Sequence, residues 1–144
     1  MDEFMQAAID EALAGLREGG IPIGSVLVKR GSIIGRGRNR RVQNHDPIAH
    51  AEIDCLRNAG RIGGFSGAFL YSTLMPCFMC AGAAAQFGIS RIVVGDAETY
   101  SEPIEFLRSR GVALEMLNLA ECREMLADFI RKNPDLWKED AGAS

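Results

Sequence analysis

The chain has 144 residues, of which 47% are hydrophobic and 24% are charged, and its formal net charge is −3. These values predict a single domain over residues 1–144, exclude a disordered chain, and offer no broad basic surface for nucleic acid. The acidic start at residues 1–4 lacks the pattern of a signal peptide. We therefore expect a cytoplasmic protein whose four cysteines bind metal or pack in the core rather than form disulfides.

Hydrophobic periodicity and turn residues predict the elements in chain order. They are helix 4–16, strands 24–29 and 32–36, helix 47–59, strand 68–74, a helix opening at Pro76, strand 91–95, helix 104–108, strand 112–117 and helix 120–132. Asp46–Pro47 has the form of a helix N-cap followed by the first helical residue, and residues 39–44 form a polar loop.

This order of elements predicts an α/β fold, a three-layer α-β-α sandwich with a mixed five-stranded sheet. The helix between the last two strands implies that they are parallel. Residues 62–90 contain no charged side chain and are numerous enough to span a bilayer. Because glycine, serine and proline interrupt them, we interpret them as a buried strand followed by a buried helix, with no membrane segment.

The residues with the most chemical content are His50, Glu52, Cys77 and Cys80. Two cysteines three apart at the start of a helix place both sulfurs on one face, and His50 adds a nitrogen. Three protein ligands leave a fourth position of Zn²⁺ for water, which the ion makes acidic. Glu52 is the natural proton acceptor. The pattern therefore predicts a catalytic zinc site.

Two other kinds of site share parts of this pattern. A strand followed by CxxC at a helix start is also the layout of thioredoxin-like redox sites, although these do not require His50 or Glu52. A structural zinc site needs a fourth ligand, from His45, Cys55 or Cys122. We expect the two cysteines to be small core residues and His45 to lie in a solvated loop.

Two motifs together carry a family resemblance. His50-Ala51-Glu52 with Pro76-Cys77-Phe78-Met79-Cys80 resembles the signature of the zinc deaminases of nucleobases and nucleosides. Within that superfamily the chain is most similar to fungal-type cytosine deaminase, and the likeness runs almost end to end. The further segments that carry it are Glu18–Gly24, Gly35–Gly37 with Asn39, and Trp137–Asp140, of which the last lies outside the general signature.

The resemblance implies a cytidine deaminase-like fold, the zinc ligands and proton shuttle named above, and a pocket for a small nucleobase. Asn39 and the backbone N–H of Ala51 would hold the ring carbonyl, and Asp140 would accept from the exocyclic amine. Tyr100 and Trp137 would close over the ring. A homodimer is also implied, since fungal-type enzymes pair through the helices beside the active site. The expected reaction is cytosine to uracil plus ammonia, in pyrimidine salvage.

Three positions depart from the family pattern, namely Met75, Phe78 and Tyr100, and we expect all three to face the pocket. They keep guanine or another amino-heterocycle open as the substrate. A local basic cluster keeps a third hypothesis open, tRNA adenosine deamination, although nucleic acid is not the expected partner. This cluster consists of Arg36, Arg38, Arg40 and Arg41.

Overall fold

The computed structural model describes residues 2–141. Its elements are α1 (Glu3–Arg17), β1 (Gly24–Lys29), β2 (Ser32–Arg38), α2 (Arg41–Asn44), α3 (Ala51–Ala59), β3 (Phe69–Leu74), α4 (Phe78–Gln86), β4 (Arg91–Asp96), α5 (Ile104–Ser109), β5 (Ala113–Met116), α6 (Ala120–Lys132) and α7 (Pro134–Ala141). The predicted strands and the first and sixth helices are found within two residues of their expected bounds.

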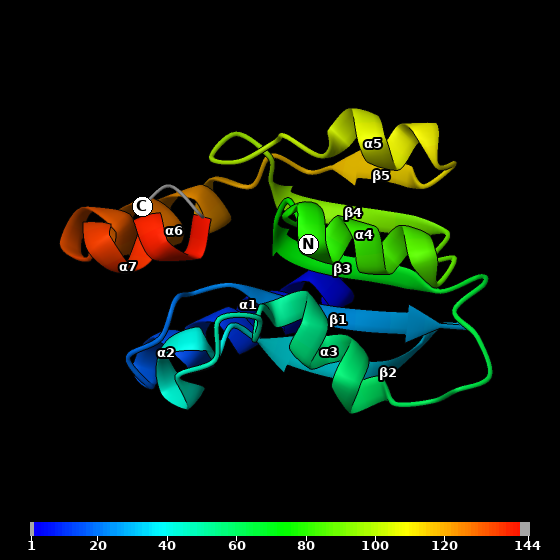
Figure 1. The fold of residues 1–144 in the computed structure, drawn as a ribbon, viewed down its shortest axis with the longest axis horizontal. Coiled ribbons are helices and arrows are strands. Elements are labelled where there is room, and N and C mark those ends of the chain that lie inside the picture. The colour runs from blue at the N-terminus through cyan, green and yellow to red at the C-terminus, as the bar shows by residue number, and fades with distance from the viewer. Residues whose placement is uncertain (1, 142–144) are drawn as a thin grey trace.

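The five strands form one mixed sheet in the order β2-β1-β3-β4-β5. Strand β1 is antiparallel to both β2 and β3, whereas β3, β4 and β5 run parallel. Helices α3, α4 and α5 cover one face, and α1 and α6 cover the other (Figure 1). This confirms the three-layer sandwich and the parallel pairing of the last two strands.

Glycine at position 37 lets α3 lie directly on β2. A Cβ atom there would overlap the backbone nitrogen of Cys55 and the carbonyl oxygen of Ala51. Any larger residue must therefore push the first turns of α3 away from the sheet. Because His50 caps this helix and Glu52 lies in its first turn, the contact sets where both side chains stand.

The start of α3 differs from the sequence prediction. The helix begins at Ala51 rather than at Pro47, and His50 is its N-cap in extended conformation. The Asp46 carboxylate accepts from the backbone N–H of Ile48 at 3.0 Å, so it caps a local turn instead of a helix. Residues 39–44, predicted to be a loop, contain the short helix α2. His45 is the C-cap of α2 and has a left-handed conformation.

Two further boundaries differ. Helix α4 begins at Phe78 with Cys77 as N-cap, so Pro76 precedes the helix rather than opening it. The predicted end of α6 at Lys132 is confirmed, but Pro134 then begins an unpredicted helix, α7. Proline suits that position because the first helical N–H needs no partner within the helix.

Residues 62–90 fold as β3 and α4 with their connections, as the sequence interpretation holds. Within residues 2–141 no helix is both long enough and apolar enough to cross a membrane.

Candidate active site and metal centre

Two helix N-termini meet at one corner of the fold. His50 caps α3, Cys77 caps α4, and Cys80 lies in the first turn of α4. Their ligand atoms all lie within 4.8 Å of one another, and His50 Nδ1 is 3.4 Å from Cys77 Sγ. The partial positive charge at the N-terminus of α4 favours thiolate at Cys77, which caps this helix. A nitrogen with two sulfurs is a donor set that zinc accepts.

The electrostatics of this corner, without a metal ion, also fit a cation. A hydrogen bond from the Cys80 thiol lowers the pKa of Cys77 to about 4, against the opposing effect of burial. The pKa of Cys80 rises well above its ordinary value because it donates to Cys77 and is buried. Burial acts to lower the pKa of His50, but the Cys77 hydrogen bond and the Asp140 charge raise it to about 9. Metal ions bind such sites by replacing protons on sulfur and imidazole.

Glu52 lies beside these donors and is only 4% exposed. Burial, followed by the negative charge of Cys77, raises its pKa to about 7. A carboxyl group with a pKa near neutrality can both accept and return a proton at physiological pH. The structure thus brings the predicted proton shuttle next to the predicted ligands.

The structural-zinc alternative requires a fourth protein ligand. In the described part of the chain, the donor cluster at this corner consists of His50, Cys77 and Cys80. His45 is exposed in its loop, Cys55 is buried against the carbonyl oxygen of Gly35 at 3.5 Å, and Cys122 is buried on α6. These three residues therefore have the positions expected of loop and core side chains.

A small cavity of about 40 Å³ opens beside the donor cluster. It brings together Asn39, Tyr100, Trp137 and Asp140, and its other lining residues are Ile23, His50, Glu52, Leu74, Met75, Cys77 and Ala141. Ala51 is fully buried next to it, and its N–H, as the first of a helix, has no acceptor inside that helix. The volume holds only a few water molecules. A nucleobase therefore requires α7, which carries Trp137 and Asp140, to shift outward.

Polar contacts across this cavity join residues 39–41 to α7. Asn39 Nδ2 donates to Asp140 Oδ1 at 3.0 Å, while Asn39 Oδ1 accepts from the backbone N–H of Arg41 at 3.1 Å. The second bond fixes the amide so that its NH₂ group faces the cavity. Arg41 Nε lies 3.7 Å from Asp140 Oδ1. Asn39 is fully buried, so its orientation depends on these partners.

The structure corrects one expectation about side chains near the site and adds one contact. Met75 and Tyr100 line the cavity, but Phe78 does not and is 55% exposed. The reason is that Phe78 is the first residue of α4 and points outward while Cys77 points in. Arg41, named from the sequence only as part of the basic cluster, has a side chain that is 10% exposed and contacts Asp140. Sequence alone offers no signal for that contact, which depends on where α7 docks.

The basic cluster is largely engaged by acidic side chains. Arg38 pairs with Glu11 at 3.0 Å and with Glu18 at 2.9 Å. Arg40 pairs with Asp54 at 3.0 Å. Their charges are thus largely balanced within the fold, which leaves less positive potential for a nucleic acid backbone.

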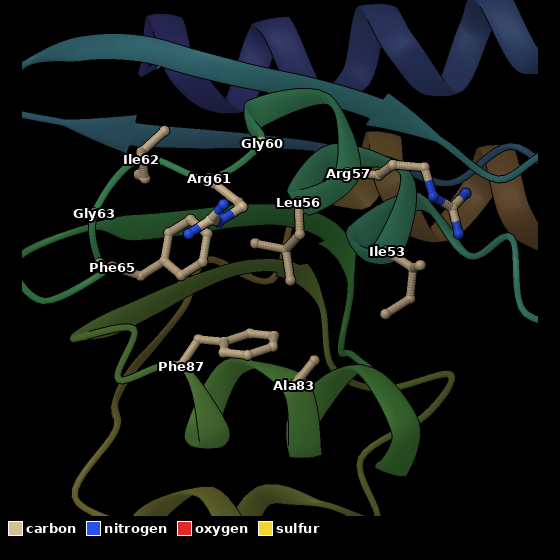
Figure 2. Close-up of a pocket in the computed structure, with 11 residues that line it drawn as sticks. Ile53, Leu56, Arg57, Gly60, Arg61, Ile62, Gly63, Phe65, Ala83 and Phe87 are labelled. Carbon is tan, nitrogen blue, oxygen red and sulfur yellow. The ribbon is translucent and has the colours of Figure 1, made fainter.

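A second, larger cavity lies away from the metal corner, between α3, the 60–65 segment and α4. Its volume is about 930 Å³, and it shares no lining residue with the small cavity. Figure 2 shows Leu56, Phe65, Ala83 and Phe87 pointing toward one another across it. Helix α4 carries no charged residue, and Phe87 is 51% exposed. The chain therefore presents an apolar surface here that Arg57 and Arg61 border.

The family model for the cytidine and deoxycytidylate deaminase zinc-binding region matches residues 1–96. The chain belongs to this family. It is a zinc-dependent hydrolytic deaminase, and this assignment decides against the thioredoxin-like interpretation. The resemblance stated from the two motifs is confirmed, and His50, Cys77 and Cys80 are placed as possible ligands of the zinc ion.

Relatives of this deaminase differ in substrate. A cytosine deaminase from Candida albicans is 39% identical over 141 residues, covering 96% of this chain and 94% of the relative. A tRNA-specific adenosine deaminase from Buchnera aphidicola is 35% identical over 144 residues, covering 90% and 87%. Each is a full-length likeness, so sequence similarity establishes the reaction class without selecting the substrate.

Solved structures similar to this chain also include deaminases of different substrates. A structure from work on A-to-I editing by tRNA:A34 deaminases superposes with a TM-score of 0.72 at 33% identity, covering 86% of this chain and 99% of that one. A guanine deaminase from Nitrosomonas europaea superposes with a TM-score of 0.71, covering 86% and 83%. At 24% identity, the second likeness shows the fold alone. The cytidine deaminase-like fold is therefore confirmed.

Proposed function

We propose that this deaminase hydrolyses the exocyclic amine of free cytosine to give uracil and ammonia, in pyrimidine salvage. The observation that carries the proposal is the position of α7, which sets Trp137 and Asp140 over the metal corner and encloses a small cavity. A free base needs only a small outward shift of α7, whereas a nucleotide within a polynucleotide needs a larger opening for the chain on either side of it. The likeness to the Candida albicans cytosine deaminase supports the same substrate.

In this proposal His50, Cys77 and Cys80 hold zinc, which supplies an activated water as the nucleophile when it is bound. Glu52 would take one proton from the attacking water and deliver it to the ring nitrogen N3, and would then carry the second proton of that water to the departing amine. Its burial and its pKa of about 7 suit it for both transfers. The carbon that loses the amine must therefore stand next to both Glu52 and the metal corner.

Recognition of the base rests on one donor and one acceptor. The NH₂ group of Asn39, aided by the N–H of Ala51, faces the ring carbonyl, and Asp140 accepts from the amine. Tyr100 and Trp137 enclose the ring. Adenine has no carbonyl to receive the Asn39 donor, and a site built for such a group rejects an analogue lacking it by roughly 10⁴-fold.

The decisive experiment is ammonia release from cytosine, cytidine, guanine and an adenosine-bearing tRNA stem-loop. We expect the highest kcat/KM for cytosine, and a strong loss with Asp140→Ala. If guanine or the stem-loop reacts faster than cytosine, the substrate is misassigned although the deaminase class stands.

Adenosine in tRNA is the second candidate, favoured by the relatives and the solved structure that act on tRNA. Two observations weigh against it in this chain. Much of the basic cluster is paired with carboxylates, and α7 covers the cavity. The stem-loop arm of the assay tests this candidate directly.

We also infer that a second copy of this chain packs on the apolar surface formed by α3 and α4. Ala83 and Phe87 line the larger cavity there, Phe87 is 51% exposed, and α4 carries no charged residue. Light scattering should give a dimer, and Phe87→Glu should weaken it because a charge would be buried in the interface. Leu16→Glu, at an apolar side chain on α1 that is 39% exposed, is the matched control. A monomeric wild-type protein contradicts the inference.

A further inference from the structure

The C-terminal helix brings a carboxylate to the metal corner itself. The His50 ring turns Nδ1 toward Cys77 Sγ, at 3.4 Å, and Nε2 toward Asp140 Oδ1, at 3.5 Å. Nδ1 is therefore the nitrogen on the side of the sulfur ligands. Nε2 faces away from them, toward α7.

Histidines that bind metals donate their other ring N–H to a carboxylate, carbonyl or water, which fixes the tautomer and makes the ring a stronger ligand. We propose that Asp140 has this positioning role for His50, so that docking of α7 and retention of zinc are coupled. The inference rests on the zinc site of the proposed function and goes beyond the contact of Asp140 with substrate. It makes the C-terminal helix a part of the metal centre.

The two roles of Asp140 use different oxygens. All three polar contacts that the structure gives this carboxylate fall on Oδ1, from Asn39 at 3.0 Å, His50 at 3.5 Å and Arg41 at 3.7 Å. Oδ2 is then the oxygen that accepts from the amine of a base. The Asp140 carboxylate thus orients the zinc ligand His50 with one oxygen and accepts from the substrate amine with the other.

The surroundings of Asp140 hold it in this position. Its side chain is 5% exposed, and a buried carboxylate is stable only with donors around it. Arg41 supplies a charge and is itself anchored, since its Nε donates to the carbonyl oxygen of Pro47 at 2.9 Å. The backbone N–H of Arg41 also donates to Asn39 Oδ1. Arg41 therefore orients both the Asp140 carboxylate and the Asn39 amide that donates to it.

Zinc retention without substrate tests the inference. Zinc-loaded protein is mixed with a chromophoric chelator, and the rate and extent of zinc transfer are measured. Loss of such a partner weakens metal binding by roughly 10–100-fold, which we expect for Asp140→Ala. Asp140→Asn preserves shape and an acceptor oxygen, so it should fall between the wild type and Asp140→Ala. Because Asp140→Asn conserves packing, impaired folding of the alanine variant does not obscure the result.

Asp135→Asn is the matched control, because it makes the same carboxylate-to-amide change on the same helix, at an exposed side chain. It should retain zinc like the wild type. If both Asp140 variants also retain zinc like the wild type, the positioning role is overturned, while the proposed substrate still stands or falls on the ammonia-release assay. If cytosine is not deaminated but Asp140→Ala still loses zinc, the positioning role stands and the proposed substrate falls.

A spectroscopic test is possible because the chain has two histidines. In the zinc-loaded wild type, NMR should show a His50 Nε2–H proton that exchanges slowly with water, and in Asp140→Ala the exchange should be faster. His45, which is exposed, serves as the internal reference. An unchanged His50 Nε2–H in Asp140→Ala overturns the inference.

Discussion

The metal corner and the C-terminal cover are built in opposite ways. The corner consists of the short segments 50–52 and 77–80, each fixed by the start of its own helix. The cover, α7, is held by contacts between residues far apart in the chain, such as Asn39 with Asp140. The difference indicates that the zinc donors and the proton shuttle are placed by local structure, whereas substrate selection and the contact of Asp140 with His50 depend on long-range docking of α7. Variants in the two regions should therefore fail in different ways.

The largest effect is expected from Cys77→Ser at the corner. This cysteine has the lowered pKa, so it is the ligand already present as thiolate, and serine cannot replace a thiolate as a zinc ligand. The variant should lose stoichiometric zinc and all measurable deamination. Metal analysis by mass spectrometry, with a zinc supplement, measures this. Cys122→Ser, at a buried cysteine outside the cluster, should keep the metal.

Glu52→Gln should separate catalysis from metal binding. The amide keeps the size of the side chain but cannot carry the proton, and loss of a general acid–base group costs roughly 10²–10⁴-fold in rate. Zinc content should be unchanged. Asp54→Asn is the control, since that carboxylate lies on the same helix and pairs with Arg40. It should lower stability without comparable loss of kcat, and an active Glu52→Gln removes Glu52 from the mechanism.

The same contrast explains what sequence alone could predict. The strands, their mixed pairing and the donor set depend on local periodicity and on spacings within one or two turns. The start of α3 was mispredicted because Asp46 has two possible uses, as a helix cap and as a turn cap. The contacts of Arg41 with Asp140 could not be read from the chain, because they arise only after α7 has folded back over the cavity.

Trp137→Ala tests the cover with a smaller expected effect. The ring packs on the apolar cluster that includes Ile21, Leu74 and Phe129, and loss of an aromatic contact with the base costs about 1 kcal/mol. We expect KM for cytosine to rise roughly fivefold with less change in kcat, and cytidine to be excluded less strictly. Lys138→Ala, at an exposed neighbour on the same helix, should leave both unchanged. An unchanged ratio of cytidine to cytosine activity would show that Trp137 does not exclude ribose.

The smallest effect is the release of protons from the metal corner when zinc binds. Near pH 7 the metal-free site holds one proton on His50, whose pKa is about 9, and one on Cys80, whose pKa is raised, while Cys77 is already a thiolate. Zinc should therefore release about two protons, and its affinity should weaken as pH falls below about 9 because protons compete for the same atoms. Calorimetry in buffers of different ionisation enthalpy counts these protons. Glu52, whose pKa is about 7, adds a fraction of a proton to this count, and Glu52→Gln removes that contribution. Release of almost no protons from the Glu52→Gln variant would contradict the charge state described for the corner.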